Sequence, residues 1–232
     1  NTEVKAGSIA IDEAHFPDKV FREQIIAEFD KDGDSVLSVD EISKAQFLNL
    51  HDMKTISSLE GIQYLTNLQS LDVSTTSVSD LSPVKNSSLK RLDCRSSKVR
   101  SVDLTRYPNL EAFVCDNTSI NSLDVSKNEK LNTLFADSTS ISNLDVTNNP
   151  NLEQLSCSNT GLMELDVTHN PQLVTLDIGD TKVKTLDISK NPNLKQLSCY
   201  MTNIAELDVT KNTKLTRLFC HDTTIKKLDL SN

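Results

Sequence analysis

Residues 152–172 read LEQLSCSNTGLMELDVTHNPQ, and residues 173–193 read LVTLDIGDTKVKTLDISKNPN. Residues 194–214 give the same phrase again, as LKQLSCYMTNIAELDVTKNTK. A leucine opens each copy at a spacing of 21 residues, and the eight opening positions are Leu68, Leu89, Leu110, Leu131, Leu152, Leu173, Leu194 and Leu215. A fixed period of this length predicts a stack of similar coils, each of which buries its apolar side only against its neighbours.

The phrase L-x-x-L-x-C places its second leucine and its cysteine two residues apart, so both face the same side of a strand. Strands of successive coils then form a parallel sheet over a continuous core. The later phrase I-x-x-L-D-V also alternates and predicts a second short strand on the opposite side of each coil. The pattern resembles the leucine-rich repeat. It predicts an α/β solenoid, a right-handed superhelix that is mostly parallel β, with a small α-helical N-terminal cap.

Three sets of polar residues recur in the register of the repeat. The position usually given to asparagine holds a hydroxyl, which can bond to backbone groups of the turn; its members are Thr76, Ser97, Thr118, Thr139, Thr160, Thr181, Thr202 and Thr223. An aspartate follows leucine at Asp103, Asp124, Asp145, Asp166, Asp187, Asp208 and Asp229. This row is either an ion-binding stripe or, as we favour, a set of acceptors for the adjacent Ser/Thr-x-Asn turns. A third row, Asn128, Asn149, Asn170, Asn191 and Asn212, is expected to stabilise the turns.

Charge divides the chain. Residues 1–60 hold 6 basic and 13 acidic side chains, a balance of −7 out of a total of −9 for the 232 residues. We therefore predict two domains, a helical cap over residues 1–60 and the repeat solenoid over 61–232. The acidic balance and the lack of a basic run argue against nucleic-acid binding. No apolar stretch approaches the ~18 residues of a membrane helix, and any lipid anchor would lie upstream of Asn1.

The cysteines and histidines form no recognisable catalytic arrangement. Five cysteines share one inward-facing repeat position, which is expected of small buried apolar residues and not of a disulfide framework; they are Cys94, Cys115, Cys157, Cys199 and Cys220. His221 follows Cys220, but strand alternation sends the two side chains to opposite faces. Because no nucleophile, phosphate-binding or zinc motif is present, we predict that the protein is not an enzyme.

Before the repeats, residues 16–29 (FPDKVFREQIIAEF) have the apolar spacing of a helix, with Pro17 in its first turn. The next twelve residues, DKDGDSVLSVDE, resemble the calcium loop of an EF-hand, and a second helix is expected to follow from Glu41. Positions 1, 3, 5, 7, 9 and 12 of that loop are Asp30, Asp32, Asp34, Val36, Ser38 and Glu41. These six residues are the candidate metal ligands.

The loop departs from the EF-hand pattern at position six, where Ser35 replaces the usual glycine. A serine in the left-handed conformation costs roughly 1 kcal/mol. Two interpretations stay open, a working calcium site and a loop that has lost its metal. If calcium binds, a single hand at the millimolar calcium outside cells implies a structural role in the cap.

The phrase ISSLEGIQYLTNLQSLDVSTTSVSDLSP, residues 56–83, resembles the start of internalin-like leucine-rich repeat domains. The 21-residue L-D-V-S-x-N repeats behind a short helical cap resemble bacterial surface leucine-rich repeat proteins. This resemblance covers residues 9–232 and implies export, display at the cell surface, and binding of a host or bacterial surface protein, or of a glycan. The chain ends inside a turn phrase at Asn232, so we expect a C-terminal cap, a further domain or a partner there.

Repeat proteins usually bind ligands on the concave sheet, through the outward strand positions. Most of those positions are small and polar here. The large ones gather in the last two repeats, at Tyr200, Arg217, Phe219 and His221, and Phe135 stands apart from them. Outward aromatics beside arginine are typical of binding hot spots. The competing interpretation is that Phe219 packs against its neighbour or under a C-terminal cap.

Recognition or adhesion through a protein ligand is therefore the predicted function. The alternative is a carbohydrate-binding module of a glycan-utilisation system, which the absence of tryptophan disfavours. An intracellular scaffold is a third possibility, which the calcium-like loop and the resemblance argue against. Calcium, in a structural role, is the one cofactor that the sequence suggests.

Overall fold

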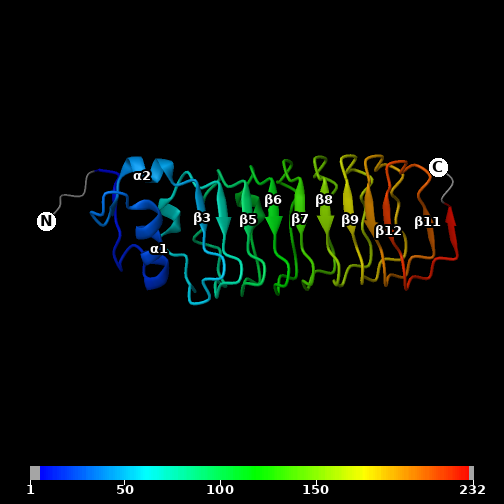
Figure 1. The fold of residues 1–232 in the computed structure, drawn as a ribbon, viewed down its shortest axis with the longest axis horizontal. Helices are drawn as coiled ribbons and strands as arrows, with labels where there is room; N and C mark the ends of the chain where they lie inside the picture. The colour runs from blue at the N-terminus through cyan, green and yellow to red at the C-terminus, as the bar shows by residue number, and fades with distance from the viewer. Residues whose placement is uncertain (1–5, 230–232) are drawn as a thin grey trace.

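The computed structural model describes residues 6–229, and these form a row of stacked coils behind an N-terminal cap (Figure 1). One strand from each of nine coils joins a nine-stranded parallel sheet. In spatial order from the cap its strands are β3 (Phe47–Asn49), β4 (Ser70–Asp72), β5 (Arg91–Asp93), β6 (Ala112–Val114), β7 (Thr133–Phe135), β8 (Gln154–Ser156), β9 (Thr175–Asp177), β10 (Gln196–Ser198) and β12 (Arg217–Phe219). The leucine-rich repeat solenoid predicted from the sequence is confirmed.

The register of the sheet follows the 21-residue period. Leu155 of β8 pairs with Leu176 of β9, which pairs with Leu197 of β10, and the other strands repeat this alignment. The central residue of each strand, a leucine except for Phe113 of β6, points into the core and is buried from β3 to β10, as is the residue two positions later; in β12 both are only partly buried. The cysteines at that later position lie inside the stack; all but the half-buried Cys220 are buried, and none forms a disulfide.

The second strand predicted on the far side of each coil is mostly absent. Within the described residues the L-D-V phrase forms strands only at β11 (Glu206–Asp208) and β13 (Lys227–Asp229), which pair in parallel. A 3-10 helix, η2 (Leu104–Arg106), replaces it in an earlier coil, and another, η1 (Ile62–Tyr64), precedes β4. In the remaining coils the phrase forms no strand, and its aspartate accepts bonds from its own turn, as Asp103 and Asp208 also do.

Each coil leaves the sheet through the same tight turn. The second residue after the cysteine position is left-handed in all eight repeats, with φ between 52° and 58°. These residues are Thr75, Ser96, Asn117, Ser138, Asn159, Asp180, Met201 and Asp222. The hydroxyl residue that follows donates to the carbonyl three residues earlier, as in Thr160 to Cys157 at 2.7 Å. The predicted turn role of the hydroxyl row is confirmed in every repeat.

The asparagine row joins one coil to the preceding ones. The Nδ2 of Asn170 donates to the carbonyls of Val146 and Asn149, both at 2.9 Å, and the equivalent asparagines do the same. Each of these side chains is completely buried. In one coil, Tyr107 occupies the position of the asparagine. Its phenol hydroxyl donates to the carbonyl of Val84 instead. The row is therefore structural, as predicted.

The aspartate row caps turns, which confirms the interpretation that we favoured over an ion stripe. Asp145 accepts from the backbone N–H and the hydroxyl of Thr147, and Asp166 accepts in the same way from Thr168. These bonds hold the pKa of both carboxyls below their usual range. The pattern holds from Asp103 to Asp208, and the side chain of Asp229 lies outside the described residues.

The cap consists of two helices and a two-stranded antiparallel sheet: β1 (Ile9–Ala10), α1 (Lys19–Phe29), β2 (Val36–Leu37) and α2 (Val39–Lys44). Helix α1 begins later than predicted, because Asp18 is its N-cap and accepts from Val20 and Phe21; Pro17 therefore precedes the helix. The nine-stranded sheet also begins at β3, inside the segment that the sequence assigned to the cap.

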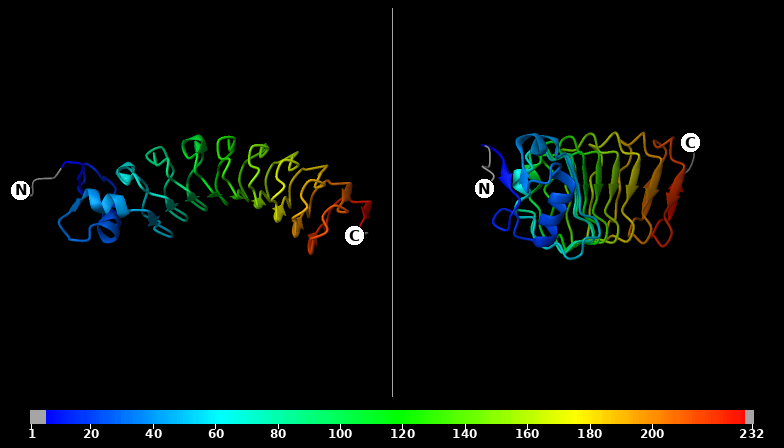
Figure 2. Two further views of the ribbon diagram at one scale, coloured as in Figure 1. Left: turned by 90° about the horizontal axis from the view of Figure 1, so that it is seen from above. Right: turned by 60° about the vertical axis from the view of Figure 1, so that its left-hand side comes forward.

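The strands line the inner side of a shallow arc, and the cap covers one end of the core (Figure 2). Phe16, Phe21 and Ile25 close that end and are fully buried. The outward positions of β3–β12 thus form a concave surface that is open along its whole length, and this is where the predicted ligand site lies.

Candidate functional site

The calcium-like loop joins α1 to α2 and has the helix–loop–helix arrangement that the sequence predicts. Asp30 organises the turn: its carboxylate accepts from the backbone N–H groups of Gly33, Asp34 and Ser35 at 2.8–3.2 Å. Ser35 is left-handed at φ 62°, so the serine at position six adopts the backbone conformation for which EF-hands use glycine. The loop strand β2 pairs with β1, so the single hand is completed by the N-terminal strand of its own chain.

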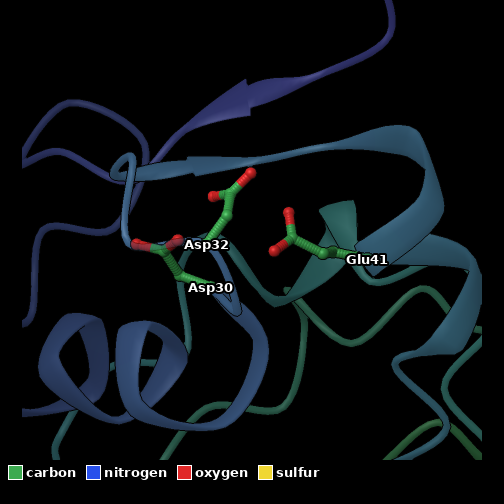
Figure 3. Close-up of side chains that lie close together, drawn as sticks. All are labelled: Asp30, Asp32 and Glu41. Carbon is green, nitrogen blue, oxygen red and sulfur yellow. The ribbon is translucent and has the colours of Figure 1, made fainter.

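Three of the six candidate ligands converge. Carboxylate oxygens of Asp30, Asp32 and Glu41 all lie within 4.8 Å of one another (Figure 3). Glu41 is buried, and hydrogen bonds from Ser38 and the backbone of Lys31 overcome the cost of burial and lower its pKa. The pKa of Asp32 is raised, because removal from water and the charges of Asp34, Glu41 and Asp30 oppose its ionisation. Three hard oxygen donors around one point fit calcium chemically.

The other three candidates lie around this cluster. Asp34 accepts from the N–H of Val36 at 2.8 Å. Ser38 is the N-cap of α2 and forms a capping box with Glu41, so its hydroxyl already has a structural partner. The structure therefore brings together the carboxylates of Asp30, Asp32 and Glu41, and that of Asp34 is not among the converging oxygens.

The concave surface carries the second candidate site. Tyr200 and His221 lie after β10 and β12, and their rings stack 5.2 Å apart and nearly parallel. Phe219 of β12 is 44% exposed beside them. Arg217 points outward from the same strand and donates to Gln196 at 3.4 Å. These four predicted residues form one patch, which we call the aromatic patch.

Phe135 does not belong to this patch. It occupies the outward row of Phe219, and the pairing runs from Phe135 through Ser156, Asp177 and Ser198 to Phe219. Four strand spacings separate the two phenylalanines, about 19 Å. A ligand that touched both would have to extend across the middle of the sheet.

Two features of this surface escaped the sequence analysis. Gly179 leaves a notch into which Tyr200 leans, since a Cβ at residue 179 would lie only 2.1 Å from Cε1 of Tyr200. At the cap end, Phe47 of β3 is 68% exposed and lines a pocket of about 300 Å³ together with Glu28, Asn49, Asp72 and Arg91. Its coil reads A-x-x-L-x-L from Ala45, which lacks the opening leucine; a looser search for the repeat would have found it.

Four of the five thiols are buried and hard to ionise. Burial raises the pKa of Cys199 to about 12 and raises those of Cys94, Cys115 and Cys157 well above the usual value, so these groups stay protonated. Cys220 is half-buried, and its neighbour His221 stacks on Tyr200 at the surface. Within residues 6–229, no helix has the length and apolar character needed to cross a membrane.

Comparison with solved structures identifies the fold. The functional domain of InlJ from Listeria monocytogenes, described as including a cysteine ladder, is 25% identical, with a TM-score of 0.55 over 98% of this chain. This chain spans 65% of that one. Two internalins of the same organism, InlF and InlC2, each give a TM-score of 0.81 at 21% and 22% identity; the matches cover 97% and 96% of this chain, and 75% and 100% of theirs.

No protein-family model matches the chain, and no curated protein matches it. The structural likeness is nevertheless consistent over the whole solenoid, and it agrees with the 21-residue register and the inward cysteines found here. Parallel coils of this kind are the architecture of protein-interaction modules. The chain therefore has the internalin-like leucine-rich repeat fold.

Proposed function

We propose that this chain is a non-enzymatic recognition module of an exported bacterial protein, which binds a host or bacterial surface protein on its concave sheet. The observation that carries the proposal is the aromatic patch: Phe219 is 44% exposed on a strand of an otherwise regular solenoid. Exposed aromatics on a rigid surface lose little conformational entropy on binding and dominate interface energies. Placement outside the cell is supported by the internalin-like fold.

The rigidity of the patch supports the same function. Tyr200 is held between the Gly179 notch and the ring of His221, so its position is set before a ligand arrives. A pre-ordered surface reduces the entropic cost of association. Phe135 would contact the same ligand only if that ligand extends along the sheet.

Calcium is proposed as a structural ion of the cap, held by Asp30, Asp32 and Glu41. Bound there, it would offset both the desolvation and the repulsion by neighbouring carboxylates that raise the pKa of Asp32. The loop connects the two cap helices, so the ion would stabilise the cap and contribute nothing to ligand recognition directly.

A capture experiment tests the recognition surface. Immobilised protein is exposed to panels of host extracellular proteins, bacterial surface proteins and glycans in calcium buffer. We expect capture of a protein by the wild type and its loss in the triple variant Tyr200→Ser, Phe219→Ser, His221→Ser. The control Val39→Ser, Met163→Ser removes exposed apolar side chains away from the sheet and should retain capture.

Equal capture by the wild type and the triple variant would reject the aromatic patch. Capture of glycans alone would instead assign the carbohydrate-binding function. Melting temperatures of all variants in the same buffer show whether a lost signal reflects binding or folding.

A further inference from the structure

The middle of the concave sheet carries three aspartates that have no ion-pair partner of their own. Asp116, Asp137 and Asp177 are half-buried, and none of them forms an ion pair among the described residues. Asp137 accepts from the N–H of Ser158 at 2.7 Å and from the hydroxyl of Ser156. Burial, and then the charge of Asp137, raises the pKa of Asp116 and of Asp177. Arg95 opposes the rise at Asp116, and no basic residue does so at Asp177. These groups are therefore held partly out of water without an ion pair.

The same surface shows what satisfies such a carboxylate. Asp93 occupies the outward row of Asp177, closer to the cap, and its side chain is 1% exposed. The guanidinium of Arg95 donates to both carboxylate oxygens of Asp93. Nε lies 3.0 and 3.1 Å from the two oxygens, and a terminal nitrogen lies 2.5 Å from one of them. A second guanidinium, that of Arg91, lies 3.3 Å away. The chain thus supplies its own arginines at Asp93.

At Asp177 both of those arginines are missing. The position two residues after Asp177 is Gly179, and the position two residues before it is Thr175. Asp116 and Asp137 follow β6 and β7 in the row of Arg95. Arg95 lies on the coil before Asp116 but is already bound to Asp93, and no basic residue occurs in this row from Asp116 to Gly179. Along β6 to β9, we consider the outward strand positions and the position two residues after each strand. Every charged residue at these positions is an aspartate.

Aromatic rings stand beside these carboxylates. Phe135 is the last residue of β7 and lies two residues before Asp137. Tyr200 leans across Gly179, toward the coil of Asp177. A planar guanidinium can bind a carboxylate through two bonds and stack on a ring at the same time, which an ammonium cannot do. A carboxylate beside an aromatic ring therefore occurs twice on this surface. The two places are at most about three strand spacings apart along the sheet, or ~14 Å.

We propose that the central concave sheet binds an arginine-bearing segment of a partner protein, with one guanidinium at Asp116 and Asp137 beside Phe135 and another at Asp177 beside Tyr200. This inference rests on the proposed recognition function and specifies the chemistry of its partner. In this arrangement each arginine of the partner binds an aspartate of the sheet in the way that Arg95 binds Asp93. The segment joins Phe135 to the aromatic patch, which otherwise lie too far apart to act together.

The test uses the full chain and a fluorescein-labelled octa-arginine peptide, with binding followed by fluorescence anisotropy. The variant Asp116→Asn, Asp137→Asn, Asp177→Asn removes three charges while each side chain keeps an oxygen that can accept its present hydrogen bonds. The control Glu129→Gln, Glu164→Gln, Glu206→Gln removes the same charge from exposed side chains outside the concave sheet. Because the chain carries −9, this control separates site binding from general attraction.

We expect the triple asparagine variant to bind about tenfold or more weakly than the wild type, and the glutamine control to lose much less. A labelled octa-lysine peptide should bind the wild type more weakly than octa-arginine does. Equal losses in the two variants, or equal binding of the two peptides, would overturn the proposal. Thermal melts confirm that the asparagine variant is folded.

A second readout keeps this inference separate from the proposed function. If a protein captured by the wild type is retained equally by the asparagine variant, the recognition module stands and the arginine site is wrong. If the peptide result holds while the serine variant of the aromatic patch keeps its ligand, the aspartates bind arginine but neither Tyr200 nor the rest of the aromatic patch contributes, and the stacking part of the inference is wrong.

Discussion

The cap and the coils of this protein use carboxylates in opposite ways. In the coils, Asp145 and Asp166 each accept two bonds from their own turn, and these bonds lower their pKa. In the cap, Asp30, Asp32 and Glu41 meet within 4.8 Å, and the pKa of Asp32 is raised. In the aspartate row, repetition spreads charge over many turns that satisfy it locally, whereas Asp116 and Asp177 on the concave sheet have raised pKa values. A single irregular loop gathers charge at one point, which is the arrangement that a cation can stabilise.

The largest effect is expected on the coil side of this comparison. Asn170→Ala removes two buried bonds, to the carbonyls of Val146 and Asn149, and leaves a gap between coils. The free energy of unfolding should fall by about 2–3 kcal/mol, measured by urea denaturation. Asn149→Ala should cost a similar amount, because its coil makes the same bonds. The exposed Asn203→Ala is the control and should change little; a comparable loss there would contradict this account.

The second effect concerns the cap. At about a hundred times its Kd, calcium should stabilise the wild type by about 2.7 kcal/mol. Glu41→Gln should abolish this gain, because the buried carboxylate is one of the three converging donors. Denaturation with and without calcium measures it. Asp145→Asn, the matched coil variant, should keep the full calcium response. A wild type that does not respond to calcium would show that the loop is only a structural turn.

A smaller effect follows from backbone strain that both regions share. Ser35 of the loop and Ser96 of a coil turn are left-handed, at φ 62° and 53°. Glycine at either position should stabilise the protein by about 0.5–1 kcal/mol, because it removes the steric penalty of the Cβ. Chemical denaturation of Ser35→Gly and Ser96→Gly compares them. A gain at Ser96 without one at Ser35 would mean that other contacts already offset the strain in the loop.

The smallest effect is a pair of opposite pH dependences. The folded-state pKa of Asp145 is lowered, so the stability that its ionised form adds is present above the unfolded pKa and is lost as pH falls. The folded-state pKa of Asp177 is raised, so its contribution is greatest in acid and is lost as pH rises through that folded value. Asp145→Asn and Asp177→Asn, unfolded between pH 3 and pH 7, should therefore diverge from the wild type in opposite directions toward neutral pH.

The periodic part of the molecule could be predicted because each coil obeys the same local rule. Leucine spacing gave the sheet, its register and the core, and residue chemistry gave the turn roles of Thr160 and Asn170. The exception is the second strand. Its alternation is real, but in the described coils it forms strands only at β11 and β13. The aspartate turn is not the reason, because Asp208 of β11 makes the same turn bonds as Asp166.

Features that depend on contact between coils could not be predicted from the sequence. A linear sequence places Tyr200 and Gly179 in one row but does not say that the tyrosine leans sideways into the notch. Phe47 was missed because the spacing from Leu48 to Leu71 is 23 residues and the opening leucine is absent. The unpaired state of Asp177 becomes visible only when Asp93 and its two arginines are seen on the same surface.

The buried cysteines can report the local opening of individual coils of the solenoid. Cys94, Cys115, Cys157 and Cys199 sit in four different coils, and each is shielded while its coil is closed. Alkylation of any one of them requires that coil to open, since the thiol must first reach water and lose its proton. Mass spectrometry after timed alkylation of the native chain would therefore give an opening rate for each coil separately, without an added label, and would show whether neighbouring coils part together or one at a time.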